Sequence, residues 1–217
     1  MSNYLAWDKQ SINPENEHEV KEKFELGFVF TRENYGSIYQ TRSLRINLAN
    51  FSLSSENRRI LAKVEGLKVE LLPLPLLDNY DWTIAKLGKD YYETKFGPGV
   101  FSANKIRELL TEKSNFNLLL KYSLNDQLVG YTICYDSPEF LQYAYPYYDL
   151  VNFANNFGMG MMLKAILNAQ EATKKYIYIG SASRPADTYK FQFSGLEWFD
   201  GTNWKTDLDT LKKLIET

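Results

Sequence analysis

The segment NNFGMGMMLKAILNAQEATKKYIYIG, residues 155–180, decides the fold because it joins a helix to a strand. Gly158 and Gly160 stand at the start of a long apolar stretch with helical periodicity, and the strand-like run YIYIG follows. A helix N-terminus offers unpaired N–H donors and a partial positive charge, and glycine lets an anion approach the backbone. We therefore expect either a phosphate-binding helix start or two glycines that only permit close helix–strand packing.

The bulk properties of the chain exclude several classes of function. Its 217 residues, 44% of them hydrophobic, are enough for a sizeable core, and the net charge of −2 limits any RNA contact to a local patch. Cys134 is the only cysteine and His18 the only histidine, which excludes an internal disulfide and argues against a metal centre or a triad. Without a signal-peptide pattern or an apolar run of about 18 residues, we expect a cytoplasmic protein with no membrane and no metal partner.

Periodicity, caps and turn residues predict a compact α/β chain with a polar N-terminal arm, a loose segment or short helix. In chain order, we expect strands at 24–30 and 38–48, a helix at 51–66, a β-like run at 67–77, a helix or helical loop at 81–97, a helix at 101–113, a hairpin at 116–135, a strand at 139–148, a helix of about 16 residues, a strand at 176–180, a short helix at 186–193, a hairpin at 196–204 and a helix at 207–217. In the helix at 101–113, Ser102 is the expected cap, and Phe101 and Ile106 form a hydrophobic staple.

This order of elements resembles the GNAT acyltransferase fold, an α/β (α+β) fold with a mixed, mostly antiparallel twisted sheet flanked by helices. In that family the helix after the third strand begins with (Gln/Arg)-x-x-Gly-x-(Gly/Ala), and its N–H groups hold the pyrophosphate of acyl-CoA. Gly158 and Gly160 match this motif, while Asn155 replaces the usual Gln or Arg. The resemblance implies an arm at 1–23 and a single GNAT-like domain at 24–217, with N-terminal strands and an Arg-rich helix at 24–75 and the GNAT core at 76–217.

Three segments resemble the arginyl- and leucyl-tRNA–protein transferases. They are TRSLRINLANFSLSSENRRILAK (41–63), QYAYPYYDLVNFANNFGMG (142–160) and YIYIGSASRPADTYKFQFSGLEW (176–198). Those enzymes carry a GNAT-like domain that moves an amino acid from tRNA to a protein N-terminus, and the resemblance covers roughly 32–65 and 95–200. Two features depart from the family: its cysteine-rich N-terminal segment is missing, and its Cys-x-Lys-Met loop reads Ala-Ser-Arg-Pro at 182–185.

Aminoacyl transfer joins an activated ester to an amine, so positioning can supply most of the acceleration and no covalent nucleophile is needed. Asp149, after the strand at 139–148, is a candidate to bind or deprotonate the acceptor ammonium, or it is a turn or cap residue. Tyr189 lies where GNAT enzymes often place the tyrosine that protonates the leaving group, or it is a packed aromatic. Lys190 can hold the terminal phosphate of the tRNA, or it can extend its ammonium to solvent.

A basic segment provides the candidate RNA patch. Between residues 31 and 70, seven basic side chains stand against four acidic ones. The candidates for phosphate contacts are Arg42, Arg45, Arg58 and Arg59. Because Arg58 and Arg59 are adjacent on a helix, at least one of them meets solvent, either to take a phosphate or as part of a solvated helix face.

The sequence thus favours an aminoacyl-tRNA-dependent transferase that acts on a protein or peptide N-terminus, with aminoacyl-tRNA as co-substrate and no cofactor. The alternative enzyme is a GNAT acyltransferase that uses acetyl-CoA. The alternative without catalysis is a GNAT-like domain that only binds RNA or a partner protein.

Overall fold

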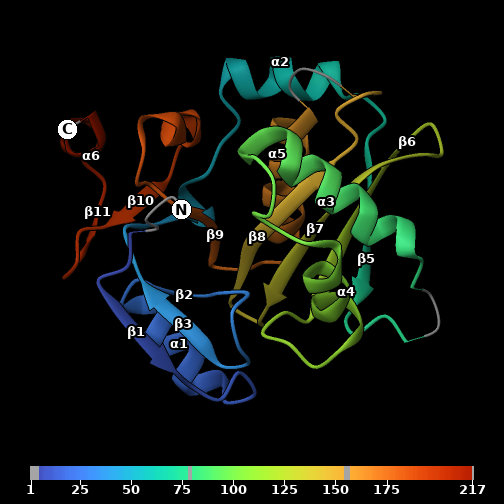
Figure 1. Ribbon diagram of the computed structural model, residues 1–217. Coiled ribbons are helices and arrows are strands. Elements are labelled where there is room, and N and C mark those ends of the chain that lie inside the picture. The colour runs from blue at the N-terminus through green and yellow to red at the C-terminus, as the bar shows by residue number, and fades with distance from the viewer. Residues whose placement is uncertain (1–4, 78–79, 154–156, 217) are drawn as a thin grey trace. The chain divides into compact units, whose positions relative to one another are not determined.

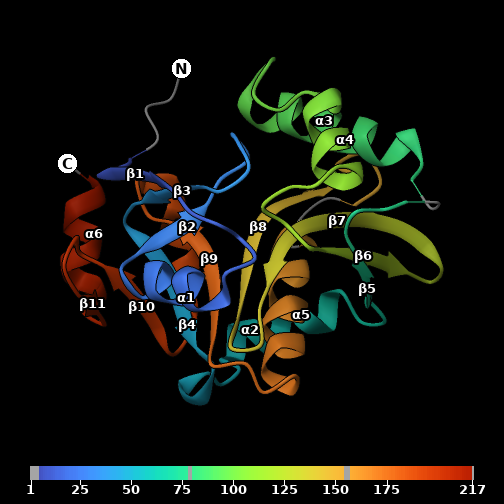
Figure 2. The same cartoon turned by 90° about the horizontal axis from the view of Figure 1, so that it is seen from below.

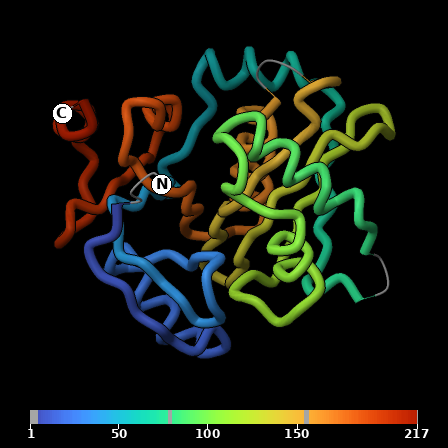
Figure 3. The backbone as a smooth tube through the Cα atoms, in the orientation of Figure 1, coloured from blue at the N-terminus to red at the C-terminus, as the bar shows by residue number. Residues whose placement is uncertain are grey.

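The computed structural model describes residues 5–77, 80–153 and 157–216 (Figure 1). The chain divides into two compact units. The first unit consists of Met1–Ser54, Ser137–Gln142 and Ala169–Thr217, and the second of Ser55–Asp136 and Tyr143–Asn168. The chain, traced in Figure 3, therefore changes unit four times, and the first unit is assembled from three separate segments.

The first unit begins with a small antiparallel sheet and one helix. The sheet has the order β1 (Asp8–Ser11), β3 (Ser37–Gln40) and β2 (Phe28–Phe30), and the helix is α1 (Glu17–Glu25). Asn16 caps α1 by accepting a hydrogen bond from the N–H of Glu19. Phe24 on α1 is fully buried, with its ring centroid 5.5 Å from that of Phe30 and 4.5 Å from that of Phe140. Aromatic packing therefore fixes α1 within this unit.

The rest of the first unit is a sheet with the strand order β11-β10-β4-β9-β8. Its elements are β4 (Ser43–Asn47), β8 (Phe140–Tyr148), β9 (Tyr176–Ser181), β10 (Leu196–Phe199), β11 (Trp204–Lys205), the 3₁₀ helices η1 (Leu48–Asn50) and η2 (Pro185–Gln192), and α6 (Leu208–Glu216). These strands pair antiparallel except for β8 and β9, which run parallel where 140–142 pairs with 176–178. The order of elements expected from the sequence, a strand, a helix and a strand, thus places YIYIG beside LQYAYPYY.

The second unit continues the strand order from the later part of β8 as β8-β7-β6-β5. Its elements are α2 (Ser55–Lys63), β5 (Lys68–Pro73), α3 (Trp82–Phe96), α4 (Ala103–Thr111), β6 (Leu118–Leu124), β7 (Gln127–Asp136) and most of α5 (Phe157–Glu171). Helices α3 and α4 cover one face of this sheet and α5 covers the other (Figure 2). A mixed, mostly antiparallel sheet flanked by helices is the fold class expected from the sequence, and it is confirmed.

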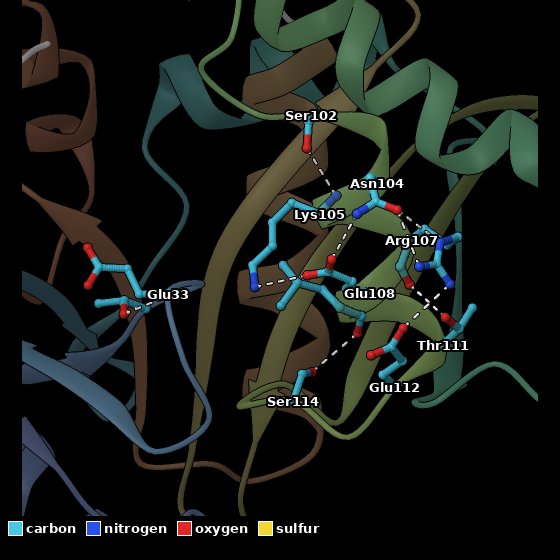
Figure 4. A network of polar contacts seen from close by, with 11 residues as sticks. Glu33, Ser102, Asn104, Lys105, Arg107, Glu108, Thr111, Glu112 and Ser114 are labelled. Atoms are coloured by element: carbon cyan, nitrogen blue, oxygen red, sulfur yellow. Dashed lines mark hydrogen bonds and ion pairs between the residues drawn. The ribbon is translucent and has the colours of Figure 1, made fainter.

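Local sequence fixes the ends of α4, as Figure 4 shows. The hydroxyl of Ser102 accepts a hydrogen bond from the N–H of Lys105 at 3.1 Å, so the predicted cap is present. Phe101 and Ile106, the predicted staple, are 2% and 0% exposed. On the solvent side, Lys105 pairs with Glu108 at 3.1 Å. Helix α4 is thereby held against the sheet, where it packs with α3.

Three stretches differ from the expected elements. The segment 1–23 contains most of the short helix that was one of its two expected forms, α1, but it also contains a strand, β1, that was not expected. The strand expected at 24–30 is shortened to β2, because Phe24 belongs to α1 and Gly27, at φ 77°, turns the chain before β2. The strand expected at 38–48 is divided into β3 and β4, which belong to two different sheets.

Alkaline titration should reveal the buried tyrosines of the second unit. Tyr122, Tyr143 and Tyr147 are at most 2% exposed, and burial raises the pKa of each well above its usual value; burial also raises the pKa of Tyr131 to about 12. Because the unfolded chain loses these protons near pH about 10, stability is complete below that pH and falls above it, by about 1.4 kcal/mol per pH unit for each such tyrosine.

Tyrosinate absorbance and circular dichroism, recorded together as the pH is raised, measure this effect. We expect part of the tyrosinate signal to appear only as the chain unfolds, and Tyr143→Phe to reduce the pH dependence of stability. Ionisation of all tyrosines in a chain that keeps its circular dichroism would contradict the prediction.

Candidate active site

A surface groove of about 370 Å³ lies in the second unit. Its walls are formed by α3, the start of β7 and the end of β8 with the loop that follows. The lining residues are Thr83, Lys86, Leu87, Asp90, Tyr91, Thr94, Leu128, Tyr148, Asp149, Leu150 and Val151. The residues on α3 recur every three or four positions, so one face of this helix lines the groove. Aromatic and apolar walls with a few charged groups are typical of a ligand site.

Tyr148, the last residue of β8, lines the groove although it is only 6% exposed. Its ring centroid lies 5.1 Å from that of Tyr91, and the Nζ of Lys95 lies 6.0 Å from it. A Cβ atom on Gly158, in the first turn of α5, would lie 3.1 Å from Cε1 and 3.5 Å from the hydroxyl oxygen of Tyr148. Burial raises the pKa of Tyr148, and the backbone N–H of Gly158 opposes this by hydrogen bonding. Tyr148 therefore connects the groove to the start of α5.

A close approach of β7 to β8 sets the backbone position of Tyr148. Gly130 on β7 lies where a Cβ atom would be 2.3 Å from the carbonyl oxygen of Tyr147 and 2.6 Å from the Cα of Tyr148. A side chain at this position would displace the end of β8. Gly130 is thus required for the geometry of the groove.

The carboxylate of Asp149 is held by its own loop. One oxygen accepts the N–H groups of Val151 at 2.8 Å and Asn152 at 3.1 Å, and the other accepts the side-chain amide of Asn152 at 2.6 Å. Burial acts to raise the pKa of Asp149, but these hydrogen bonds outweigh it and the pKa is lowered. Of the roles considered for Asp149, this geometry provides the cap of a turn and a fixed negative charge that can attract an ammonium, rather than a base.

At both glycines of the opening segment, the space that a side chain would need is already occupied by a neighbouring residue. A Cβ atom on Gly160 would lie 2.8 Å from Cγ2 of Val64, and one on Gly158 would meet Tyr148 as described above. Close packing therefore accounts for both glycines. Phosphate binding by the N–H groups at this helix start stays a prediction, and Asn155 lies outside the described residues.

Arg58 and Arg59 lie on α2, and both side chains are exposed, whereas their adjacency alone predicts that at least one of them meets solvent. Arg59 also forms an ion pair with Glu56 on the same helix. Val64 directly follows α2 and contacts the first turn of α5 at Gly160. The arginine pair thus belongs to the helix that packs beside the start of α5 (Figure 1).

Tyr189 and Lys190 lie on η2 of the first unit. The side chain of Tyr189 is 48% exposed. Lys190 is buried, and its Nζ donates to the carbonyl of Ser181 at 2.9 Å and pairs with Asp187 at 3.3 Å. Asp187 also accepts the N–H of Ser183 at 3.0 Å. The buried ammonium of Lys190 therefore holds the loop after β9 together through these two contacts, and it does not extend to solvent.

Arg42 and Arg45, the other two RNA candidates, also belong to the first unit. Arg42 is partly buried and donates to the carbonyl of Ala182 at 3.2 Å, and burial lowers its pKa. Arg45 is 4% exposed and forms ion pairs of 2.7 Å with both Glu25 and Glu197. The guanidinium of Arg45 therefore binds two carboxylates of its own unit. This structural role differs from the phosphate contact expected from the sequence.

The candidate residues therefore fall into two groups. The second unit holds Asp149, Gly158, Gly160, Arg58 and Arg59, and the first holds Tyr189, Lys190, Arg42 and Arg45. Sequence reasoning missed the α3 wall of the groove and the position of Tyr148. The polar and aromatic side chains at spacings of three and four within residues 83–94 were the available signal for that wall.

Two features of the described residues bear on the partners of the chain. In residues 5–77, 80–153 and 157–216, the helices are too short or too polar to cross a membrane. Within the same ranges, no three His, Cys, Asp or Glu side chains are arranged to hold a metal ion.

No family model and no curated protein matches the chain. Among solved structures, it is similar to the C-terminal domain of a putative lysylphosphatidylglycerol synthetase from Agrobacterium fabrum, with 12% identity, a TM-score of 0.49, and coverage of 82% of this chain and 56% of that one. L-PGS from Bacillus licheniformis has 10% identity and a TM-score of 0.48, over 93% of this chain and 71% of that one. A functionally unknown conserved protein from Staphylococcus epidermidis has 12% identity and a TM-score of 0.40, over 88% and 68%.

Proposed function

We propose that this chain is an aminoacyltransferase that moves an amino acid from tRNA to the N-terminal amine of a protein or peptide. The observation that carries the proposal is the position of Tyr148, which lines the groove and contacts Gly158 at the start of α5. A groove for an acceptor and a helix start for an anionic donor then meet at one residue. Acyl transfer needs this juxtaposition, because the reacting groups must be held in contact.

The donor side favours a long polyanion. The first turn of α5 offers N–H groups to an anion, and α2, with Arg58 and Arg59 exposed, packs beside it. The acceptor end of a tRNA carries successive phosphates, so it can contact both elements at once. Acetyl-CoA, the alternative donor, is supported by the helix start alone.

The groove, as the proposed acceptor site, favours an amine of which a part is already deprotonated near neutral pH, so that no general base is needed. The carboxylates that line the groove in the described part of the chain are Asp90, which pairs with Lys86, and Asp149, whose pKa is lowered. Neither is suited to remove a proton from an ammonium. An N-terminal amine has a pKa of about 7.7–8.0, against about 10.4 for lysine, so about 10–20% of the former but under about 0.1% of the latter is neutral at pH 7. The groove therefore suits an N-terminal amine.

The decisive experiment offers a total tRNA pool, charged with labelled amino acids, to the chain together with peptides of varied N-termini. We expect label to enter peptides with a free N-terminus and not their N-acetylated counterparts. Parallel reactions contain labelled acetyl-CoA as donor, or phosphatidylglycerol vesicles as acceptor. Transfer only from acetyl-CoA would replace the proposed donor, and transfer only to lipid would replace the proposed acceptor.

Charge reversal on α2 tests the RNA contact. Arg58→Glu with Arg59→Glu should weaken tRNA binding, because two phosphate contacts are lost, and should reduce the slope of log K against log salt by about 1.4–1.8. Filter binding or fluorescence anisotropy over a series of salt concentrations gives this slope.

The matched control for this prediction reverses two charges on α4, with Lys105→Glu and Arg107→Glu. We expect that double variant to keep the parent slope. If both double variants weaken binding equally, the effect is one of net charge and α2 holds no specific contact.

A further inference from the structure

The leaving group of the proposed reaction needs a proton. When the acceptor amine displaces the ester, the 3′-oxygen of the tRNA leaves with a negative charge unless an acid is in reach. Tyr148 is the groove residue that also touches the first turn of α5, where the donor is proposed to bind. The side chain of Tyr148 therefore lies where the groove meets the start of α5.

The surroundings of the Tyr148 hydroxyl suit proton transfer in both directions. Burial raises the pKa of Tyr148, so the hydroxyl is protonated at neutral pH and available as an acid. The backbone N–H of Gly158 hydrogen-bonds the hydroxyl oxygen and favours the tyrosinate that forms transiently.

We infer that Tyr148 is a catalytic residue that donates its proton to the leaving 3′-oxygen; this inference rests on the proposed function. The neutral amine attacks the ester carbonyl, the C–N bond forms and the C–O bond to the ribose breaks. The 3′-oxygen takes the hydroxyl proton of Tyr148, and the resulting tyrosinate takes the proton that the new amide nitrogen gives up. The products are an amide and a free 3′-hydroxyl, and Tyr148 returns to its starting state.

Other polar groups of the groove are less suited to this step. Asp149 has a lowered pKa and is a carboxylate at neutral pH, so it carries no proton to give. Lys86 is paired with Asp90 on the surface of α3. Tyr91 lines the groove on α3, but the hydroxyl that meets Gly158 is that of Tyr148.

Tyr148→Phe removes the hydroxyl and keeps the ring that packs on Tyr91. The experiment measures single-turnover transfer to a peptide, from the tRNA charged with whichever amino acid the parent uses, together with kcat and KM. We expect kcat to fall by about 10²-fold or more, with KM and tRNA binding within about twofold of the parent. Tyr92→Phe is the matched control, because Tyr92 does not line the groove and its hydroxyl donates to the carbonyl of Pro146 at 3.2 Å.

The possible outcomes separate this inference from the proposed function. A parent chain that transfers amino acids, with a Tyr148→Phe variant that melts as the parent does and keeps its kcat within about threefold, overturns the inference alone. Equal losses in Tyr148→Phe and Tyr92→Phe would assign the effect to packing and also overturn it. A parent chain that transfers nothing from charged tRNA overturns both.

Discussion

Replacement of Arg45 by alanine should lower the free energy of unfolding by about 3–5 kcal/mol, because it leaves the largely buried carboxylate of Glu197 and the partly exposed carboxylate of Glu25 without their partner. The guanidinium forms 2.7 Å ion pairs with Glu25 and Glu197, and the latter side chain is only 15% exposed. It also lies between two aromatic rings, with its Cζ 3.8 Å from the centroid of Tyr176 and 3.9 Å from that of Trp204. Denaturant unfolding of the parent and the variant measures the loss.

The matched control for Arg45 is Arg59→Ala, which breaks an exposed ion pair with Glu56 and should cost about 0–1 kcal/mol. Arg45→Lys should recover only part of the stability, because a lysine cannot contact two carboxylates and two rings with a planar group. If Arg45→Ala and Arg59→Ala unfold at the same denaturant concentration, the ion pairs of Arg45 contribute no more to stability than an exposed pair, and the prediction is wrong.

Replacement of Gly158 by valine should reduce aminoacyl transfer by about 10²-fold or more, because it displaces the side chain proposed to protonate the leaving group. The new Cβ atom would lie 3.1 Å from the ring of Tyr148, and the two methyl groups beyond it must push that ring away. Overpacking of this kind also costs about 1–3 kcal/mol of stability. Melting and transfer must therefore be measured separately on the same preparation.

Gly88→Ala controls for the loss of stability in this second experiment. Its Cβ atom would lie 2.6 Å from Cδ1 of Ile106, so it should destabilise α3 and α4 without contacting Tyr148. We expect Gly88→Ala to transfer amino acids as the parent does at temperatures where it is folded. A Gly158→Val variant that is folded and transfers as the parent does would show that the glycine serves packing only.

Much of the fold could be predicted because its signals are local. Ser102 caps α4 in the structure, and the hairpin of β6 and β7 turns through Asn125 and Asp126 at φ 49° and 63°, as the turn residues indicated. The placement of β9 beside β8 followed from the order of elements, and the structure adds that the two strands run parallel. Each of these features depends on residues a few positions apart or on the sequence of elements alone.

The site was predicted less well because its contacts are long-range. The basic segment around Arg45 indicates a cation on the surface. In the structure Arg45 is instead paired with Glu197, which is 152 positions away on a neighbouring strand. The groove likewise depends on the approach of α3 to the end of β8, and the closeness of Gly130 to Tyr148 depends on strand register. No local pattern encodes such approaches, so Tyr148 could be recognised only with the fold in view.

The three-segment make-up of the first unit has a consequence for biosynthesis on the ribosome. Strand β4 leaves the exit tunnel early, but its partners β9 and β10 are translated about 130–150 residues later, roughly 7–30 s at 5–20 residues per second. During that interval Leu44 and Ile46, fully buried in the finished chain, have no strand to cover them. The part of the first unit that precedes Ser55 therefore stays incomplete until β9 and β10 emerge, whereas the second unit can complete its sheet while translation continues.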